Sequence, residues 1–316
     1  MPNWKEVLLE INDAHAQKLS ESPIDFVRRK YLRELSEFTG RNLIAYYSGF
    51  LQRPNSLDGS INDKDVSGFM LNINKLDKSK GLDLILHTPG GAISATEAIV
   101  NYLQAVFGKN IRLLVPQIAM SAGTMIAFAG KEIVMGKHSS LGPIDPQVGN
   151  MPAEAVIGEF ERAKADILKD PRAAGYWQFI LSKYHPTFLT SCEQAIALSK
   201  DLAGVWLLNN MCEGDQGKVD IILKLFSSHE ETKMHARHIG KDKCKEAGLN
   251  IADIESNQQF QDLLLTVHHA FMHTFSASGA VKIIENHEGN AYIENIPINI
   301  HPHQLQPIKN EFQNIS

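Results

Sequence analysis

The sequence predicts an α/β protein with a mainly parallel central sheet and a mostly helical C-terminal half. Short apolar segments alternate with helical periodicity between about residues 42 and 135. This alternation is typical of strand–helix–strand crossovers, which place successive strands parallel in one sheet. From Ala153 to about Phe226 helical periodicity dominates. Functional side chains are then expected at the carboxyl ends of the parallel strands.

Changes in periodicity predict the elements in chain order. Residues 4–38 show helical spacing and form a helical lead-in, after which the pattern changes to strands. The predicted strands are Asn42–Ser48, Leu82–His87, Ile111–Val115 and Glu132–Met135. The predicted helices beside them cover about 63–77 and 94–107, and a third helix is opened by Met120–Thr124 and runs to about Gly130. A helix at 258–275 precedes a predicted hairpin with strands at 280–284 and 290–295. We therefore expect three regions: a lead-in at 1–40, a core at 41–230, and a C-terminal helical region with the hairpin at 231–316.

Composition argues against a polyanionic partner and against a membrane anchor. The formal net charge is −5, whereas nucleic-acid recognition usually leaves a basic surplus. The apolar segment 111–130 is interrupted by Pro116 and Gly123, so we expect no stable membrane insertion. The N-terminus shows no signal-peptide pattern, which favours a cytoplasmic protein. The three cysteines form no Cys-x-x-Cys pair, so neither a disulfide framework nor a zinc site is expected.

Two strand-to-helix turns carry the residues that predict chemistry. The first is Thr88-Pro-Gly-Gly-Ala92, whose paired glycines let a backbone N–H face a ligand with no side chain between them. The second is Met120-Ser-Ala-Gly-Thr124, with Ser121 at the turn and Ala122 directly after it. Two such N–H donors stabilise a developing oxyanion by roughly 3 kcal/mol each. The two turns therefore indicate acyl transfer with a serine nucleophile.

A serine hydroxyl needs a neighbouring base, and the sequence offers two candidates. Lys164 lies at the start of the helical half, and His138 follows the fourth strand. Simpler roles remain open for the same residues. Ser121 could cap a helix, and Lys164 could belong to a solvated helix face among acidic neighbours. His138 and Asp145 could be structural, with Asp145 fixing a loop.

Three segments of the chain resemble the serine dehydrogenase proteinase family. They are His87-Thr-Pro-Gly-Gly-Ala92, Ala119-Met-Ser-Ala-Gly-Thr124 and Leu141-Gly-Pro-Ile-Asp-Pro-Gln147, in this order and spacing. The family is related to signal peptide peptidase A and, more distantly, to the proteolytic subunit of Clp protease. The resemblance is dense over residues 82–147 and extends to about residue 250 through Met234–Ile239.

This resemblance implies a Clp/crotonase-like fold built from turns of a ββα spiral. It implies a nucleophile at Ser121 and an oxyanion hole from Gly91 and Ala122, with Gly90 supporting the turn. The signal peptide peptidase branch uses a Ser-Lys dyad whose lysine follows on a helix, which favours Lys164. Such a lysine must be buried to lose its proton at neutral pH.

The Clp branch uses a histidine–aspartate pair instead, which His138 and Asp145 could imitate. His138 is closer in sequence to Ser121 than that branch's histidine is to its serine, so this triad ranks second. The resemblance also implies a homo-oligomer, since the fold commonly forms rings or stacked trimers. Membrane-anchored relatives carry an N-terminal apolar segment that this sequence does not show.

The resulting hypothesis is an ATP-independent serine peptidase that acts on a peptide or protein substrate and needs no cofactor or metal. Two alternatives stay open: acyl-CoA-type chemistry on the same fold, and a catalytically inactive oligomeric scaffold that binds peptides. Two groups of histidines could also suggest a metal site: His268, His269 and His273, and His229, His235 and His238. Because no glutamate stands between His269 and His273 in the metalloprotease pattern, structural or surface roles are favoured.

Overall fold

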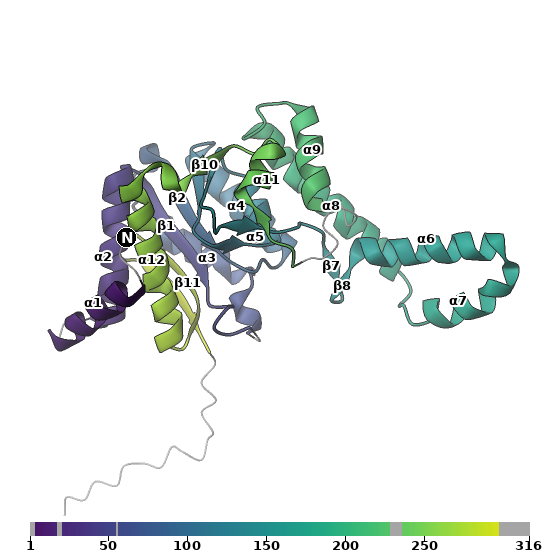
Figure 1. Ribbon diagram of the computed structural model, residues 1–316, viewed down its shortest axis with the longest axis horizontal. Coiled ribbons are helices and arrows are strands. Elements are labelled where there is room, and N and C mark those ends of the chain that lie inside the picture. The colour runs from purple at the N-terminus through teal and green to yellow at the C-terminus, as the bar shows by residue number, and fades with distance from the viewer. Residues whose placement is uncertain (1–3, 18–20, 55, 228–235, 297–316) are drawn as a thin grey trace, which may run out of the picture.

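A computed structural model describes residues 4–17, 21–54, 56–227 and 236–296. A seven-stranded sheet forms its centre, in the order β10-β5-β3-β2-β1-β11-β12. These strands are β1 (Asn42–Ser48), β2 (Leu82–His87), β3 (Ile111–Val115), β5 (Glu132–Met135), β10 (Ile251–Asp253), β11 (Ala280–Asn286) and β12 (Ala291–Asn295). The strands from β10 to β1 run parallel, and β11 and β12 are antiparallel to their neighbours. The predicted α/β fold with a mainly parallel sheet is confirmed (Figure 1).

Helices cover both faces of the sheet and continue into the C-terminal half (Figure 1). They are α1 (Trp4–Ala16), α2 (Pro23–Thr39), α3 (Lys64–Ile73), α4 (Ile93–Phe107), α5 (Ala122–Phe128), α6 (Ala153–Lys169), α7 (Ala174–Leu181), α8 (Phe188–Asn209), α9 (Gln216–Ser227), α11 (Lys241–Glu246) and α12 (Gln258–Ala277). Short strands form two smaller sheets: β4 (Ile118–Ala119) with β6 (Ser140–Leu141) and β9 (Ile239–Gly240), and β7 (Gln147–Val148) with β8 (Met151–Pro152). The order β3, β4, α5 forms one ββα unit of the kind that the sequence predicts.

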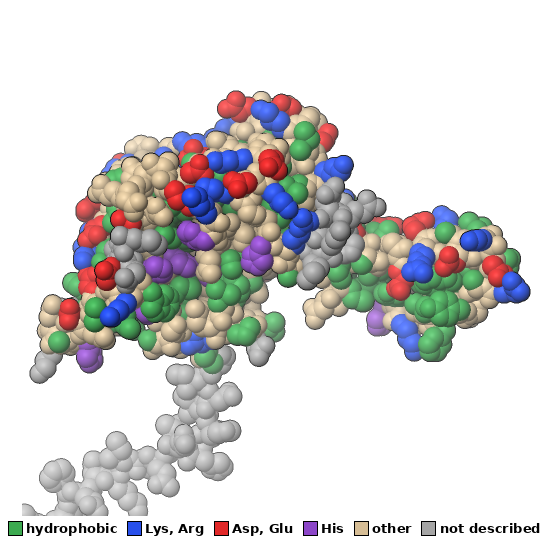
Figure 2. All heavy atoms as spheres, viewed as in Figure 1, with side chains coloured by type: hydrophobic (Ala, Val, Ile, Leu, Met, Phe, Trp, Pro, Cys, Tyr) green, Lys and Arg blue, Asp and Glu red, His purple; other side chains and the backbone are tan. Residues whose placement is uncertain are grey.

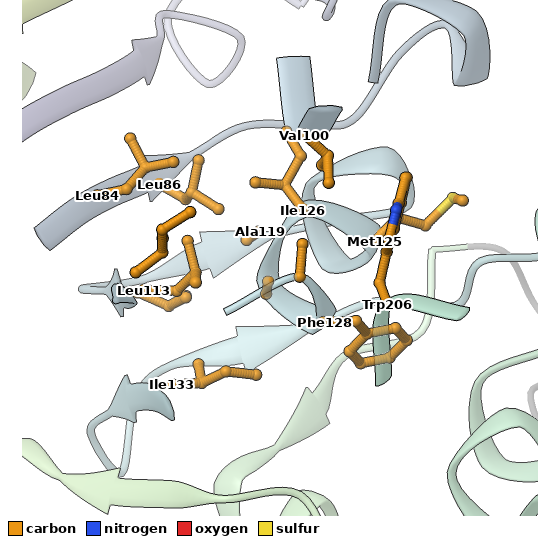
Figure 3. Close-up of a cluster of buried hydrophobic side chains, with 14 of the residues drawn as sticks. Leu84, Leu86, Val100, Leu113, Ala119, Met125, Ile126, Phe128, Ile133 and Trp206 are labelled. Atoms are coloured by element: carbon orange, nitrogen blue, oxygen red, sulfur yellow. The ribbon is translucent and has the colours of Figure 1, made fainter. Parts of the chain in front are cut away.

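Side chains of β1 alternate between two apolar cores, as the pleat of a strand requires. Ile44 and Tyr46 face a core built with α3, α4, α5 and α8, part of which Figure 3 shows. Leu43 and Tyr47 face a second core built with α2 and α12. The protein therefore has three layers, and Tyr46 points to the layer that contains α5.

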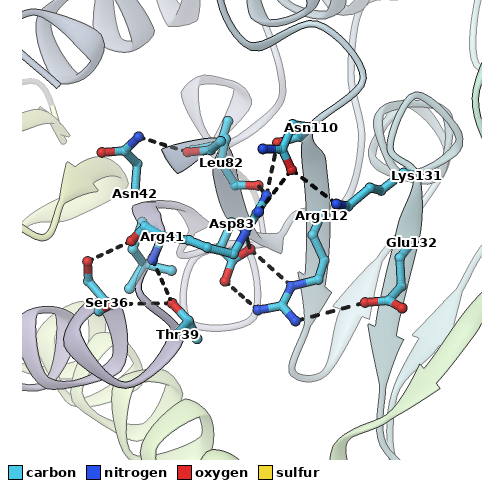
Figure 4. Close-up of polar contacts among 12 residues, drawn as sticks. Ser36, Thr39, Arg41, Asn42, Leu82, Asp83, Asn110, Arg112, Lys131 and Glu132 are labelled. Atoms are coloured by element: carbon cyan, nitrogen blue, oxygen red, sulfur yellow. Dashed lines mark hydrogen bonds and ion pairs between the residues drawn. The ribbon is translucent and has the colours of Figure 1, made fainter. Parts of the chain in front are cut away.

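A buried carboxylate fixes the amino ends of the central strands (Figure 4). Asp83 on β2 is fully buried and accepts hydrogen bonds from Arg41 Nε at 2.6 Å and from Arg112 Nη2 at 2.6 Å. Arg41 also donates to the carbonyl oxygens of Leu82 and Asn110. Because these contacts tie β1, β2 and β3 together, the register of the strands is fixed before they reach their carboxyl ends.

The C-terminal hairpin is part of the central sheet. Its first strand, β11, pairs with β1, and α12 packs against α2. The buried guanidinium of Arg28 on α2 contacts the buried carboxylate of Glu285 on β11 and donates to Thr274 on α12 at 3.1 Å. Residues from the two ends of the chain therefore build one layer together.

Helices α6 and α7 form an arm, residues 153–181, that projects from the body of the molecule (Figure 1). The base of the arm packs through a small cluster that includes Val156 and Cys192 of α8. Farther out, large apolar side chains are exposed: Leu168 to 78%, Tyr176 to 66% and Phe179 to 69%. Figure 2 shows hydrophobic side chains gathered on this arm.

Candidate active site

Ser121 occupies a strained turn between β4 and α5. Its backbone has φ 52° and ψ −118°, a region that non-glycine residues rarely adopt. Strain of this kind clusters at functional sites, and a serine on a sharp strand-to-helix turn is the geometry of a nucleophile elbow. Among the described residues, the Ser121 side chain makes no capping hydrogen bond to α5. Helix capping alone therefore does not explain this serine.

The paired-glycine turn after β2 presses directly against the Ser121 turn. Gly90 has φ 101°, and a Cβ atom added there would lie 2.7 Å from Ser121 Cβ and 2.8 Å from the Met120 carbonyl oxygen. A Cβ at Gly91 would lie 2.3 Å from the carbonyl oxygen of Ile61. Backbone hydrogen bonds join the Ile61 N–H to Gly90 O at 2.8 Å and the Ala92 N–H to Ile61 O at 2.9 Å. Both glycines are therefore required by close backbone approach.

Two backbone donors beside the serine have no acceptor. Within the part of the chain that the structure describes, neither the Gly91 N–H nor the Ala122 N–H donates a hydrogen bond. Gly91 is exposed, and Ala122 begins α5 directly after Ser121. Free backbone N–H groups on both sides of a serine are what the stabilisation of an oxyanion requires.

A cavity of ≈ 640 Å³ opens beside Ser121. It is lined by Ser60, Pro89, Gly90, Gly91, Ala92, Ile93, Ser94, Ser121, Met125, Ile144, Pro146, Gln147, Asn150, Ala195 and Leu198. Its volume lies within the usual range of ligand pockets. None of these lining residues carries a titratable side chain, so the described walls of the cavity supply no general base.

In a single copy of the chain, Lys164 is not among the residues that line this cavity. It is on α6 in the arm, its side chain is 70% exposed, and its Nζ is 3.8 Å from the Glu161 carboxylate. The structure therefore does not bring Lys164 and Ser121 together in a single copy.

His138 and Asp145 occupy different environments. His138 is exposed on the loop after β5, and its ring lies close to Gly136. Asp145 is buried at 1% exposure, and Gln147 Nε2 donates to its Oδ2 at 3.3 Å. In the described ranges, His138 makes no hydrogen bond to Ser121.

Histidines of the two groups that could suggest a metal site make structural contacts. His268 is buried against Tyr47, with 3.3 Å between the hydroxyl and Nδ1, and His273 Nε2 is 3.0 Å from the Trp4 carbonyl oxygen. His238 Nδ1 is 2.7 Å from Ser140 Oγ. The described residues contain no group of three His, Cys, Asp or Glu side chains that could hold a metal ion. His229, Met234 and His235 lie outside the described residues.

Sequence reasoning missed the walls that α8 and the β7–β8 hairpin contribute. Ala195 and Leu198 come from α8, and Gln147 and Asn150 come from the hairpin. Helical periodicity alone does not tell which face of α8 borders a ligand. The Gly149-Asn150 dipeptide could have revealed the hairpin, because both residues adopt the positive φ that a two-residue turn of this type needs.

Residues 19–173 match the family of ClpP-like SDH-type serine proteinases. The resemblance stated from the sequence is thereby confirmed, and with it the ClpP-like α/β fold. The matched region contains both glycines of the first turn and Ser121. The family is one of serine proteinases.

Two relatives come from Methanocaldococcus jannaschii, and both are named as uncharacterized proteins. One is 33% identical over 162 residues, which cover 49% of this chain and 55% of the relative. The other is 42% identical over 81 residues, which cover 26% of this chain and 27% of the relative. The chain therefore spans about half or less of the length of these curated relatives.

Solved structures with a similar outline include two proteases. A membrane-bound stomatin-specific protease matches at TM-score 0.37 and 18% identity, over 66% of this chain and 79% of its own. ClpP1 from Listeria monocytogenes matches at TM-score 0.36 and 12% identity, over 71% of this chain and 97% of its own. Among the described helices of this chain, none has the length and apolar character that crossing a bilayer demands.

Proposed function

We propose that the protein is a serine peptidase in which Ser121 attacks the carbonyl carbon of a peptide bond, without ATP. The observation that carries the proposal is the contact between the two turns: Gly90 lies so close to Ser121 that only a glycine fits. The free N–H groups of Gly91 and Ala122 belong to the two turns that meet at Ser121, which supports their role as oxyanion donors. A carbonyl attacked by Ser121 would develop negative charge where these donors stabilise it.

The proton of the Ser121 hydroxyl has to pass to a base, and we propose Lys164 for this role. Its side chain is exposed on the arm, so it must be delivered by a second copy of the chain. The apolar side chains of Leu168 and Phe179 on the same arm give that copy a surface to cover. Burial in such an interface would favour the neutral amine, which is the form that accepts a proton. His138, supported by Asp145, remains the second candidate.

Replacing the nucleophile tests the proposed function. Ser121→Ala is expected to abolish both peptide cleavage and covalent labelling by a fluorophosphonate. Ser94→Ala is the matched control, because Ser94 lines the same cavity but is the second residue of α4. The proposal is wrong if Ser121→Ala still labels at the rate of the wild type, or if the wild type neither labels nor cleaves any peptide of a mixed-sequence library. The second result would favour the scaffold alternative.

Subunit mixing tests the delivery of Lys164 by a second copy. Ser121→Ala and Lys164→Ala chains are each expected to be inactive alone. After unfolding and refolding in equal amounts, a dimer should regain about a quarter of the wild-type activity, because half of the dimers contain one intact pair. Lys169→Ala, on the same helix, is the control and should keep full activity. No recovery on mixing excludes Lys164 acting across an interface, and full activity of Lys164→Ala excludes it as the base.

A further inference from the structure

Thr88 connects the two turns of the candidate site. It follows β2, is fully buried, and its Oγ1 accepts a hydrogen bond from the Gly90 N–H at 3.1 Å. Its backbone N–H donates to Ile118 O at 3.1 Å, and its carbonyl oxygen accepts from the Met120 N–H at 3.0 Å. Thr88 therefore holds the glycine turn through its side chain and the serine turn through its backbone.

A buried carboxylate lies below the site. Tyr46 on β1 donates its hydroxyl proton to Asp65 Oδ2 at 2.8 Å, and Asp65 Oδ1 accepts from Lys282 Nζ at 2.8 Å. These three side chains and that of Thr88 are each 0% exposed. Tyr46 and Lys282 therefore hold the Asp65 carboxylate in place.

Asp65 also reaches the other side of the glycine turn. Its Oδ2 accepts from the backbone N–H of Asn62 at 3.0 Å. The preceding residue, Ile61, pairs with the glycine turn through the two backbone hydrogen bonds to Gly90 and Ala92. The glycine turn is therefore fixed from two sides: by the Thr88 hydroxyl, and by Asp65 through the segment that pairs with Gly90 and Ala92.

We propose that Tyr46, Thr88 and Asp65, with Lys282 as the counter-ion, are positioning residues for the oxyanion donor at Gly91. This inference rests on the proposed function, since it explains how that function is held in place. A glycine pair is intrinsically mobile, so its N–H groups stay aimed only if neighbouring groups fix the turn. Buried hydrogen bonds are suited to this, because electrostatic interactions are stronger at low dielectric. None of the three residues touches the cavity, so they act only through the turn.

Tyr46→Phe is the decisive variant, because it removes one hydroxyl and keeps the ring. Its kcat is expected to fall by at least about tenfold while KM stays within about twofold, since an oxyanion donor acts in the transition state. Fluorophosphonate labelling of Ser121 should slow in parallel. Tyr47→Phe is the matched control: Tyr47 is the next residue of β1, equally buried, but its hydroxyl contacts His268 on the other face of the sheet. It should leave kcat unchanged.

Thr88 supplies the rescue experiment. Thr88→Val keeps the shape and loses the hydroxyl, so it should reproduce the loss seen in Tyr46→Phe. Thr88→Ser keeps the hydroxyl and should recover most of kcat. The two losses should multiply in the double variant Tyr46→Phe/Thr88→Val, because the two hydroxyls support the turn through separate hydrogen bonds.

Hydrogen exchange makes the inference testable without peptide turnover. Amide exchange in a peptide covering residues 88–92 should speed up in Tyr46→Phe but not in Tyr47→Phe, with thermal unfolding checked for both. The inference fails if Tyr46→Phe is folded and keeps wild-type kcat and wild-type exchange, while Ser121-dependent cleavage persists. If the wild type cleaves no peptide, the proposed function is wrong instead. Amide exchange alone would then decide whether these hydrogen bonds fix the turn.

Discussion

Substituting Gly90 by alanine tests how tightly the two turns must pack. The backbone at φ 101° is unfavourable for an L-residue by roughly 1–2 kcal/mol. The new methyl group would also stand 2.7 Å from Ser121 Cβ and 2.8 Å from Met120 O, well inside ordinary van der Waals contact. Relieving this overlap requires the Ser121 turn to move by several tenths of an ångström, and overpacking costs about 1–3 kcal/mol more. We expect the free energy of unfolding to fall by about 2–5 kcal/mol.

The effect on activity should exceed the effect on folding. Displacing a catalytic group by about 1 Å costs roughly 100-fold in rate, so kcat/KM of folded Gly90→Ala is expected to fall on that order. Gly108→Ala is the matched control, because Gly108 also has positive φ, 58°, but nothing lies within 4 Å of an added Cβ. It should lose about 1 kcal/mol of stability and no activity. Denaturant titration and steady-state kinetics measure both quantities. Wild-type kcat/KM in folded Gly90→Ala would refute the argument from close approach.

Three further predictions follow from buried groups and from the cavity. Burial lowers the pKa of His87 to about 3, so the folded protein excludes a proton that the unfolded chain takes up near pH 6.5. Stability is therefore lost as pH falls from about 6.5 towards 3, by of order 4 kcal/mol, and His87→Phe should flatten this part of a denaturation–pH profile. Glu285→Ala should cost about 3 kcal/mol in denaturant unfolding, because the buried Arg28 guanidinium then keeps only the partly exposed Asp25 as an anionic partner. Glu161→Ala, on the exposed arm, should cost under about 1 kcal/mol. Leu198→Asp adds a charge to a cavity wall that has none, so in a peptide library it should shift preference from apolar towards basic side chains next to the cleaved bond; an unchanged profile would remove Leu198 from the specificity site.

The central strands could be predicted from the sequence because they are buried on both faces. Strands of a covered parallel sheet are continuous apolar segments, and β1, β2, β3 and β5 have the bounds that such segments predict. The two-residue strands β4, β6 and β9 are too short to show any periodicity. Strand β10 is also short and half-buried at the sheet edge, so its pattern does not stand out either.

The candidate site was predictable where chemistry depends on local backbone. Paired glycines and a serine at strand-to-helix turns are visible in sequence, and they lie in adjacent turns as expected. The position of Lys164 was not predictable, because spacing along a helix does not tell whether that helix packs on the core or projects from it. The cavity walls from α8 depend on long-range packing in the same way.

The strained backbone at Ser121 depends on the residues that surround it. Ser121 holds a backbone conformation that its own side chain does not stabilise, and Gly90 is held against it at a distance that no other residue tolerates. Strain of this kind persists only where surrounding structure over-determines it. Here the surroundings are the buried hydrogen bonds of Thr88 and of Asp65. The candidate nucleophile Ser121 can be recognised from four neighbouring residues in the sequence, whereas its geometry depends on residues from three distant segments. Weakening those segments should therefore lower activity before it unfolds the protein.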